Sequence, residues 1–233
     1  MASPGELVRK VAEVLGVPEP TVVVHDRNLV TAGLRTKGGR GRSAAKMTPG
    51  DAANLILAVA GSSMVKNTVE TVNDYANLPS RVDRPINPRT EPGGPSIRQT
   101  ESWDLSAFPI PSLQSLSPNH TFRDALTALI EAAADGSLQE AVRNLPVEQV
   151  GEHRIPNHWR IEVILWGPYP QASIRIYCKN FKEDHHYSAI PTGMDAIMEW
   201  AKDFESQHDG GDLNQIREFS AKTILTIGEL LKN

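Results

Sequence analysis

The stretch GLRTKGGRGR, residues 33–42, decides how we divide the rest of the chain. It holds four glycines and four Arg or Lys side chains in ten residues. These charges require water or an anionic partner, and the glycines have no side chains that could pack. The sequence on both sides of the stretch is able to fold. We therefore expect a basic, flexible finger held between two folded elements, and this is the first indication that the chain contacts nucleic acid.

The distribution of charge supports the same interpretation, although the whole chain has a net charge of −4. Residues 1–60 contain eight Lys and Arg against five Asp and Glu. Residues 61–233 therefore have a net charge of −7. This asymmetry is typical of a chain whose first part meets a polyanion while the remainder has another role.

The composition is that of a folded protein, with 39% hydrophobic and 22% charged residues among 233. No apolar run approaches the roughly 20 residues that a membrane span needs, and the N-terminus lacks the apolar core of a signal peptide. We expect a cytoplasmic protein with no membrane contact. The single cysteine, Cys178, fits a reducing compartment, and its β-like surroundings indicate a small buried hydrophobic side chain.

The first 78 residues read as helices around the basic stretch. Apolar spacing predicts a helix over Glu6–Leu15. The segment Thr21–Ala32 contains three consecutive valines, which favour a strand, but Thr21 is a plausible N-cap and the later apolar residues continue a helical face, so we expect a helix. Thr48 as N-cap and Pro49 at the first helical position predict a third helix, and Met64–Leu78 extends this as a further one.

Residues 79–118 differ in character, because they contain eight of the seventeen prolines. Proline removes backbone donors and stops helices, so we expect an extended connector. A few apolar residues indicate that part of it docks on a neighbouring surface, and these are Trp103, Leu105, Phe108 and Ile110.

The remainder reads as a second compact region. The expected helices are Thr121–Ala134, Leu138–Leu145, Met194–Phe204 and Leu213–Leu231, and the expected strands are Trp159–Trp166, Ser173–Cys178 and His186–Ile190. The alternation in Ser173–Cys178 is typical of a sheet with one wet face. The apolar stripe of the long last helix is our hypothesis for an oligomer interface.

The resulting expectation is an α+β protein. Residues 1–78 would form a DNA-binding domain, residues 79–118 a proline-rich linker, and residues 119–233 an α+β domain with an antiparallel β-hairpin and terminal helices. This last domain would serve dimerisation or effector sensing.

The order of helix, tight turn, helix, basic finger and helix resembles that of winged helix–turn–helix DNA-binding domains, including those of the MerR type. The residues that carry the resemblance run from Val11 through Leu34, followed by Arg40-Gly41-Arg42 and Thr48–Ala52, about a quarter of the chain. It implies that Thr21–Ala32 is the recognition helix and residues 35–46 the wing. The implied major-groove residues are Thr21, His25, Arg27 and Asn28, and the implied phosphate or minor-groove residues are Arg35, Lys37, Arg40, Arg42 and Lys46.

Other chemistry is less well supported by the sequence. Residues 38–43 are glycine-rich but lack the spacing and the Gly-Lys-Ser/Thr ending of a nucleotide-binding P-loop. His153, His158 and the cluster Glu183–His186 match no recognised metal-ligand pattern, so we interpret them as solvated turn residues. We expect no metal, no cofactor and no catalysis.

The function expected from the sequence is that of a homodimeric transcription regulator that binds double-stranded DNA. An architectural or phage-type DNA-packaging protein is the first alternative. An enzyme that uses the C-terminal histidines and a protein-interaction module are the others.

Overall fold

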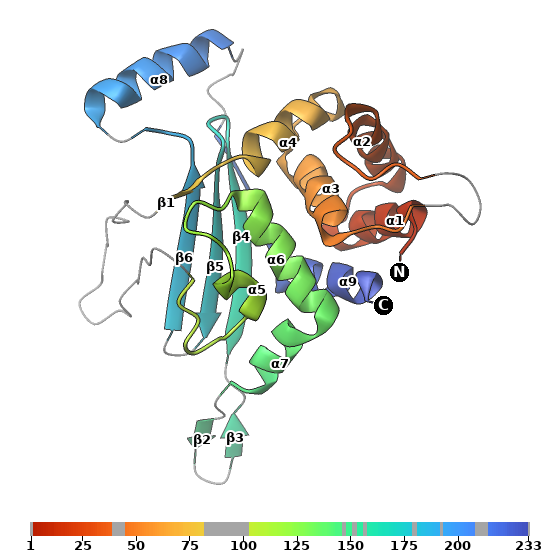
Figure 1. The fold of residues 1–233 in the computed structure, drawn as a ribbon, viewed down its shortest axis with the longest axis vertical. Helices are drawn as coiled ribbons and strands as arrows, with labels where there is room; N and C mark the ends of the chain where they lie inside the picture. Colours follow the sequence, from red (N-terminus) through yellow and green to blue (C-terminus); the bar gives the residue numbers. More distant parts are fainter. Residues whose placement is uncertain are drawn as a thin grey trace.

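The computed structural model describes residues 2–38, 45–81, 103–145, 148–150, 153–155, 158–178, 181–191, 193–207 and 214–232. Within these ranges the chain is an α+β protein, with a group of helices at its N-terminal end and an antiparallel sheet in its C-terminal part (Figure 1). The fold class predicted from the sequence is therefore confirmed.

The N-terminal helices are α1 (Pro4–Leu15), α2 (Glu19–Ala32), α3 (Pro49–Gly61), the 3₁₀ turn η2 (Val65–Asn67) and α4 (Thr68–Ala76). The predicted start of α3 is confirmed: the Thr48 hydroxyl accepts from the Asp51 amide at 3.1 Å, and the Asp51 carboxylate accepts from the Thr48 amide at 2.9 Å. The valine-bearing segment is a helix, as we expected. The single helix expected from Met64 is instead divided into η2 and α4.

The later helices are α5 (Pro111–Gln114), α6 (Phe122–Asp135), α7 (Ser137–Arg143), α8 (Met194–Gln207) and α9 (Ala221–Leu231). The strands are β1 (Ser80–Arg81), β2 (Glu148–Val150), β3 (His153–Ile155), β4 (Trp159–Gly167), β5 (Gln171–Cys178), β6 (Phe181–Ser188) and β7 (Gln215–Ser220). Among the described helices, none has the length and apolar character that a bilayer span requires.

The main sheet has the strand order β1-β6-β5-β4-β7, and every neighbouring pair is antiparallel. In β5, Ile174 and Ile176 are fully buried, whereas Arg175 and Tyr177 lie on the opposite face and are partly exposed. This is the one-sided wetting that the alternation predicts. Cys178 is buried, as expected. The third strand is longer than predicted and begins already at Phe181.

The expected helix Leu213–Leu231 is wrong in its first part. Residues 215–220 form β7, which pairs with β4 from Glu162↔Ser220 to Gly167↔Gln215, and α9 begins only at Ala221. The free edge of β4 supplies hydrogen-bond partners that favour a strand here. The Ser220 hydroxyl then accepts from the Lys222 amide at 3.3 Å and caps α9.

The apolar stripe proposed for an oligomer interface is therefore also wrong in its role. Ile224 and Ile227 are fully buried within this chain, while Ile216 in β7 is 68% exposed. The part of the stripe that lies in α9 fills the hydrophobic core and is not available to a second copy.

One hydrophobic core joins the first and last parts of the chain. Helix α6 packs against α3 on one side and α9 on another, and α9 in turn packs against α1 (Figure 1). The described part of the proline-rich segment also belongs to this core, as its apolar residues predict; its buried side chains include Trp103, Leu105, Phe108 and Ile110. Buried side chains from residues 1–78 and from residues 119–233 thus pack together.

Candidate nucleic-acid interface

Helix α2, the expected recognition helix, presents an outward face with little polar chemistry. It begins at Glu19, so Thr21 lies at its third position and is not the N-cap that we expected. Val23 and Val24 are 37% and 40% exposed, and Arg27 is exposed beside them. Base edges in the major groove are read mainly by side-chain donors and acceptors. Of the four residues expected there, Arg27 and the half-buried Thr21 remain accessible.

His25 and Asn28 point into the protein. His25 is buried, and its Nδ1 lies 2.8 Å from the Thr68 hydroxyl at the start of α4. Asn28 Nδ2 donates to the Val65 carbonyl at 3.1 Å and to the same hydroxyl at 3.3 Å. Burial lowers the pKa of His25 below its ordinary value, which favours the neutral ring. We remove both residues from the DNA-contacting set, because their polar atoms hold α2 on α4.

Arg35 is also turned inward. Its Nε and Nη2 donate to Asp26 Oδ1 and Oδ2, both at 2.7 Å, and its Nη1 donates to the Thr36 carbonyl at 2.8 Å. The Arg35 and Asp26 side chains are only 8% and 13% exposed. Arg35 therefore anchors the chain after α2, and we remove it from the set of phosphate-binding residues.

The segment that follows is fixed to α3 by two short hydrogen bonds. Asn54 Nδ2 donates to the Leu34 carbonyl at 2.6 Å, and the Thr36 amide donates to Asp51 Oδ1 at 2.7 Å. Burial opposes ionisation of Asp51, but the hydrogen bonds from Thr36 and Thr48 outweigh it and hold its pKa below the ordinary value. An ionised Asp51 thus holds both the start of α3 and the start of the basic stretch.

Gly38 and Ala45, the described residues on either side of residues 39–44, lie next to each other. A Cβ atom on Gly38 would lie 2.1 Å from the Ala45 amide nitrogen, so only glycine permits this approach. The Met47 amide also donates to the Ala2 carbonyl at 3.0 Å, which fixes the far end. Lys37 and Lys46 are exposed on the two sides of this junction.

Arg40 and Arg42 lie outside the described residues, since residues 39–44 are not among them. The described parts of the expected wing, residues 35–38 and 45–46, contain no strand. The wing and the resemblance to MerR-type domains therefore stay predictions.

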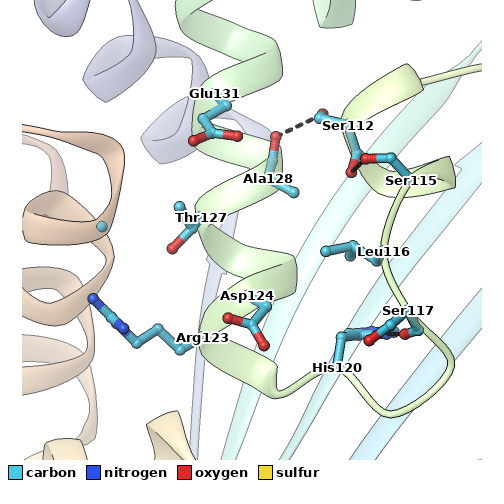
Figure 2. Close-up of a pocket in the computed structure, with 11 residues that line it drawn as sticks. Ser112, Ser115, Leu116, Ser117, His120, Arg123, Asp124, Thr127, Ala128 and Glu131 are labelled. Carbon is cyan, nitrogen blue, oxygen red and sulfur yellow. Dashed lines mark hydrogen bonds between the residues drawn. The ribbon is translucent and has the colours of Figure 1, made fainter.

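The structure places one further cationic side chain, which the sequence did not indicate, near the basic stretch. Arg123 in α6 is exposed, and its Nε donates to Asn54 Oδ1 at 2.9 Å. Figure 2 shows its side chain extending from α6 toward the N-terminal helices, away from Ser115 and Ser117. It lines a cavity of about 450 Å³ together with Lys37, and on its other side a groove of about 370 Å³ near Ser112 and Glu131. No signal in the sequence predicts that Arg123 lies near the basic stretch. It is held there by Asn54, from which it is separated by 69 positions in the sequence.

The histidine cluster differs from our expectation of solvated turn residues. Glu183–His186 lie within strand β6, and Glu183, Asp184 and His185 are buried. The sequence reads as polar, but the strand alternates its side chains between the core face and the outer face of the sheet. The interpretation as a turn is therefore wrong.

On the outer face, Asp184 is the centre of a network of polar contacts. It accepts from the Ser173 hydroxyl at 2.6 Å and from Arg175 Nε at 2.9 Å, and His186 Nε2 lies 3.1 Å from it. Burial opposes ionisation of Asp184, but His186, Ser173 and Arg175 hold its pKa below the ordinary value. Ser173 donates to the acid and not to a histidine, so this is not the order in which a base activates a serine nucleophile.

A metal centre has no support in the part of the chain that the structure describes, where no group of three or more His, Cys, Asp and Glu side chains could hold an ion. His153 lies in β3, and His158 is exposed just before β4.

Comparison of the chain with protein-family models, with curated proteins and with solved structures gave no match.

Proposed function

We propose that this protein binds double-stranded DNA through the phosphates, with the basic finger, residues 33–48, as its contact. One observation carries the proposal: hydrogen bonds fix residues 34–36 on one side of the finger and Met47 and Thr48 on the other, while Lys37 and Lys46 face solvent. Arg40 and Arg42 lie between these lysines in the sequence. Four cations in a segment whose two flanks are fixed match the negative charge of a duplex backbone.

The geometry supports a sequence-tolerant role, in DNA packaging or architecture, better than a regulatory one. His25 and Asn28 are engaged inside the protein, and the valines on the outward face of α2 have no donors or acceptors for base edges. Phosphate contacts position a protein on DNA but do not read its sequence. A transcription regulator is our second candidate, because Arg27 is exposed on α2 and an arginine can discriminate guanine.

A homodimer in the cytoplasm remains part of the proposal. A few phosphate contacts give weak binding at physiological salt, and two copies on one duplex would strengthen it. Its interface is not the α9 stripe, which is buried. No cofactor or metal is required for binding of this kind.

The test is to titrate the protein into each of two unrelated short duplexes at several salt concentrations and to measure binding by fluorescence anisotropy. Lys37→Ala/Lys46→Ala and Arg40→Ala/Arg42→Ala should each reduce the slope of log K against log salt by about two. The control is Lys202→Ala/Lys222→Ala, which removes the same charge from exposed positions on α8 and α9. Equal slopes for the finger variants and the wild type would refute DNA binding by the finger.

The same titration separates the two roles. A packaging or architectural protein should bind both duplexes with affinities within about tenfold, whereas a regulator should prefer its operator by about 10³ or more. Selection from random duplexes would supply the operator if one exists.

A further inference from the structure

A cavity of about 450 Å³ lies at the base of the basic finger, between the start of α3 and the side chain of Arg123. Residues from three separate parts of the chain line it. They include Leu34, Thr36, Lys37, Thr48, Asp51 and Arg123. A space of this kind can admit one phosphate group from solvent.

The charges around the cavity leave an excess of positive charge. The charge of Arg35 is neutralised by Asp26. The Asp51 carboxylate accepts hydrogen bonds from Thr36 and Thr48. Within the described ranges, neither Lys37 nor Arg123 has a carboxylate partner. The ionised Asp51 contributes one negative charge to the lining, so with Lys37 and Arg123 the cavity keeps an excess of one positive charge.

The Arg123 guanidinium is held in place by only part of its hydrogen-bond donors in the described chain. Among the described residues, its one hydrogen bond runs from Nε to Asn54 Oδ1 at 2.9 Å. Its Nη2 lies across Gly50, where a Cβ would approach it to 3.3 Å. Asn54 in turn donates to the Leu34 carbonyl of the finger, so one residue positions both walls of the cavity. Within the described part of the chain the two Nη groups have no partner of their own and form a fork, the geometry that binds phosphate oxygens in pairs.

The position of this guanidinium also favours an anion. It lies over the first turn of α3, where the helix dipole is positive and a cation is unfavourable. A phosphate between Arg123 and Lys37 would offset that repulsion.

We propose that this cavity is a seat for a phosphate group, with the Arg123 fork and the Lys37 ammonium as its cationic ligands. The inference deepens the proposed function, because it adds to the finger a phosphate contact from α6 in the second half of the chain. The same chemistry could come from a phosphate of the DNA backbone or from free phosphate, and the experiment separates these sources.

The first arm uses inorganic phosphate alone on the full chain, with the Arg123 Nε–Hε resonance followed by NMR. The chemical shifts of this resonance and of the Thr36 amide, which also borders the cavity, should change with phosphate concentration and reach a plateau. Arg123→Gln should abolish the change at Thr36. The control is Arg143→Gln, which removes a matched exposed charge from α7. Circular dichroism and thermal melting establish that both variants are folded.

The second arm uses duplex DNA. Arg123→Gln should reduce the salt slope by about one, while Arg143→Gln leaves it unchanged. A phosphate response with no DNA binding by the wild type would support the seat and refute the proposed function. An unchanged Thr36 response and salt slope in Arg123→Gln would overturn the seat, even if the wild type binds DNA through its finger.

Discussion

Arg35 and Asp26 share two parallel hydrogen bonds, each 2.7 Å long, between the middle of α2 and the start of the basic finger. Nine residues separate them, and both side chains are largely shielded from water. Such a bidentate pair fixes direction as well as distance. It therefore determines the angle at which the finger leaves the helices.

Arg35→Ala should lower the free energy of unfolding by about 3 kcal/mol, because it leaves the Asp26 carboxylate shielded and unpaired. The measurement is urea denaturation. Arg27→Ala is the matched control: Arg27 is exposed on the same helix, and its loss should change stability by less than about 0.5 kcal/mol. Equal stabilities of the two variants would show that the pair is not an anchor.

Gly38→Ala should weaken DNA binding while the rest of the fold remains intact. The new Cβ would lie 2.1 Å from the Ala45 amide nitrogen, so the backbone at residue 38 and the backbone at Ala45 must separate. Gly5→Ala is the control, since nothing lies within 4 Å of its Cβ position. Anisotropy titrations with one duplex compare the two variants. If Gly38→Ala binds as tightly as Gly5→Ala, the junction at Gly38 does not position the finger.

Ile224→Ala should cost about 2–4 kcal/mol of stability, because Ile224 is fully buried in α9. Ile216→Ala should cost less than about 0.5 kcal/mol, since Ile216 is 68% exposed. Both isoleucines belong to the stripe that the sequence assigned to one helix. Denaturation of both variants measures the loss of stability, and sedimentation measures their oligomeric state. A change of oligomeric state in Ile224→Ala without loss of stability would contradict the core position of α9.

The stability of the protein should fall as the pH decreases below 6.5. Burial lowers the pKa of His25 and of His120 from the ordinary 6.5, so the unfolded chain binds protons more readily than the folded one. The free energy of unfolding therefore rises with pH up to about 6.5 and then levels off. His25→Gln should weaken the dependence between pH 7 and pH 5 in urea denaturation, whereas His158→Gln, at an exposed position, should preserve it. An unchanged dependence in His25→Gln would refute the role of His25.

Two local signals in the sequence predicted local structure correctly, although a third, Thr21 as an N-cap, was wrong. Thr48 and Asp51 complete a cap within four residues, and the alternation of Ile174 and Ile176 with Arg175 follows directly from strand geometry. Such features depend on neighbours along the chain, which is why the start of α3 and the core face of β5 could be read in advance.

Contacts between distant residues could not be read in this way. The apolar spacing of residues 213–231 suits a helix as well as a strand followed by a helix. The edge of β4, about 50 residues earlier, decides between them. His25 turns inward because Thr68 lies across from it, 43 residues later. The inward side of α2 and the position of Arg123 both depend on how the helices pack, which no pattern within either helix encodes.

The packing of α9 against α1 and α6 also bears on how the protein is made. Ile224 and Ile227 of α9 are fully buried in the hydrophobic core, so α1 lacks part of its support until α9 has left the ribosome. We expect the nascent N-terminal region to stay loosely packed during translation and to consolidate only once α9 has emerged. A chaperone that shields exposed apolar helices would find its substrate in that interval.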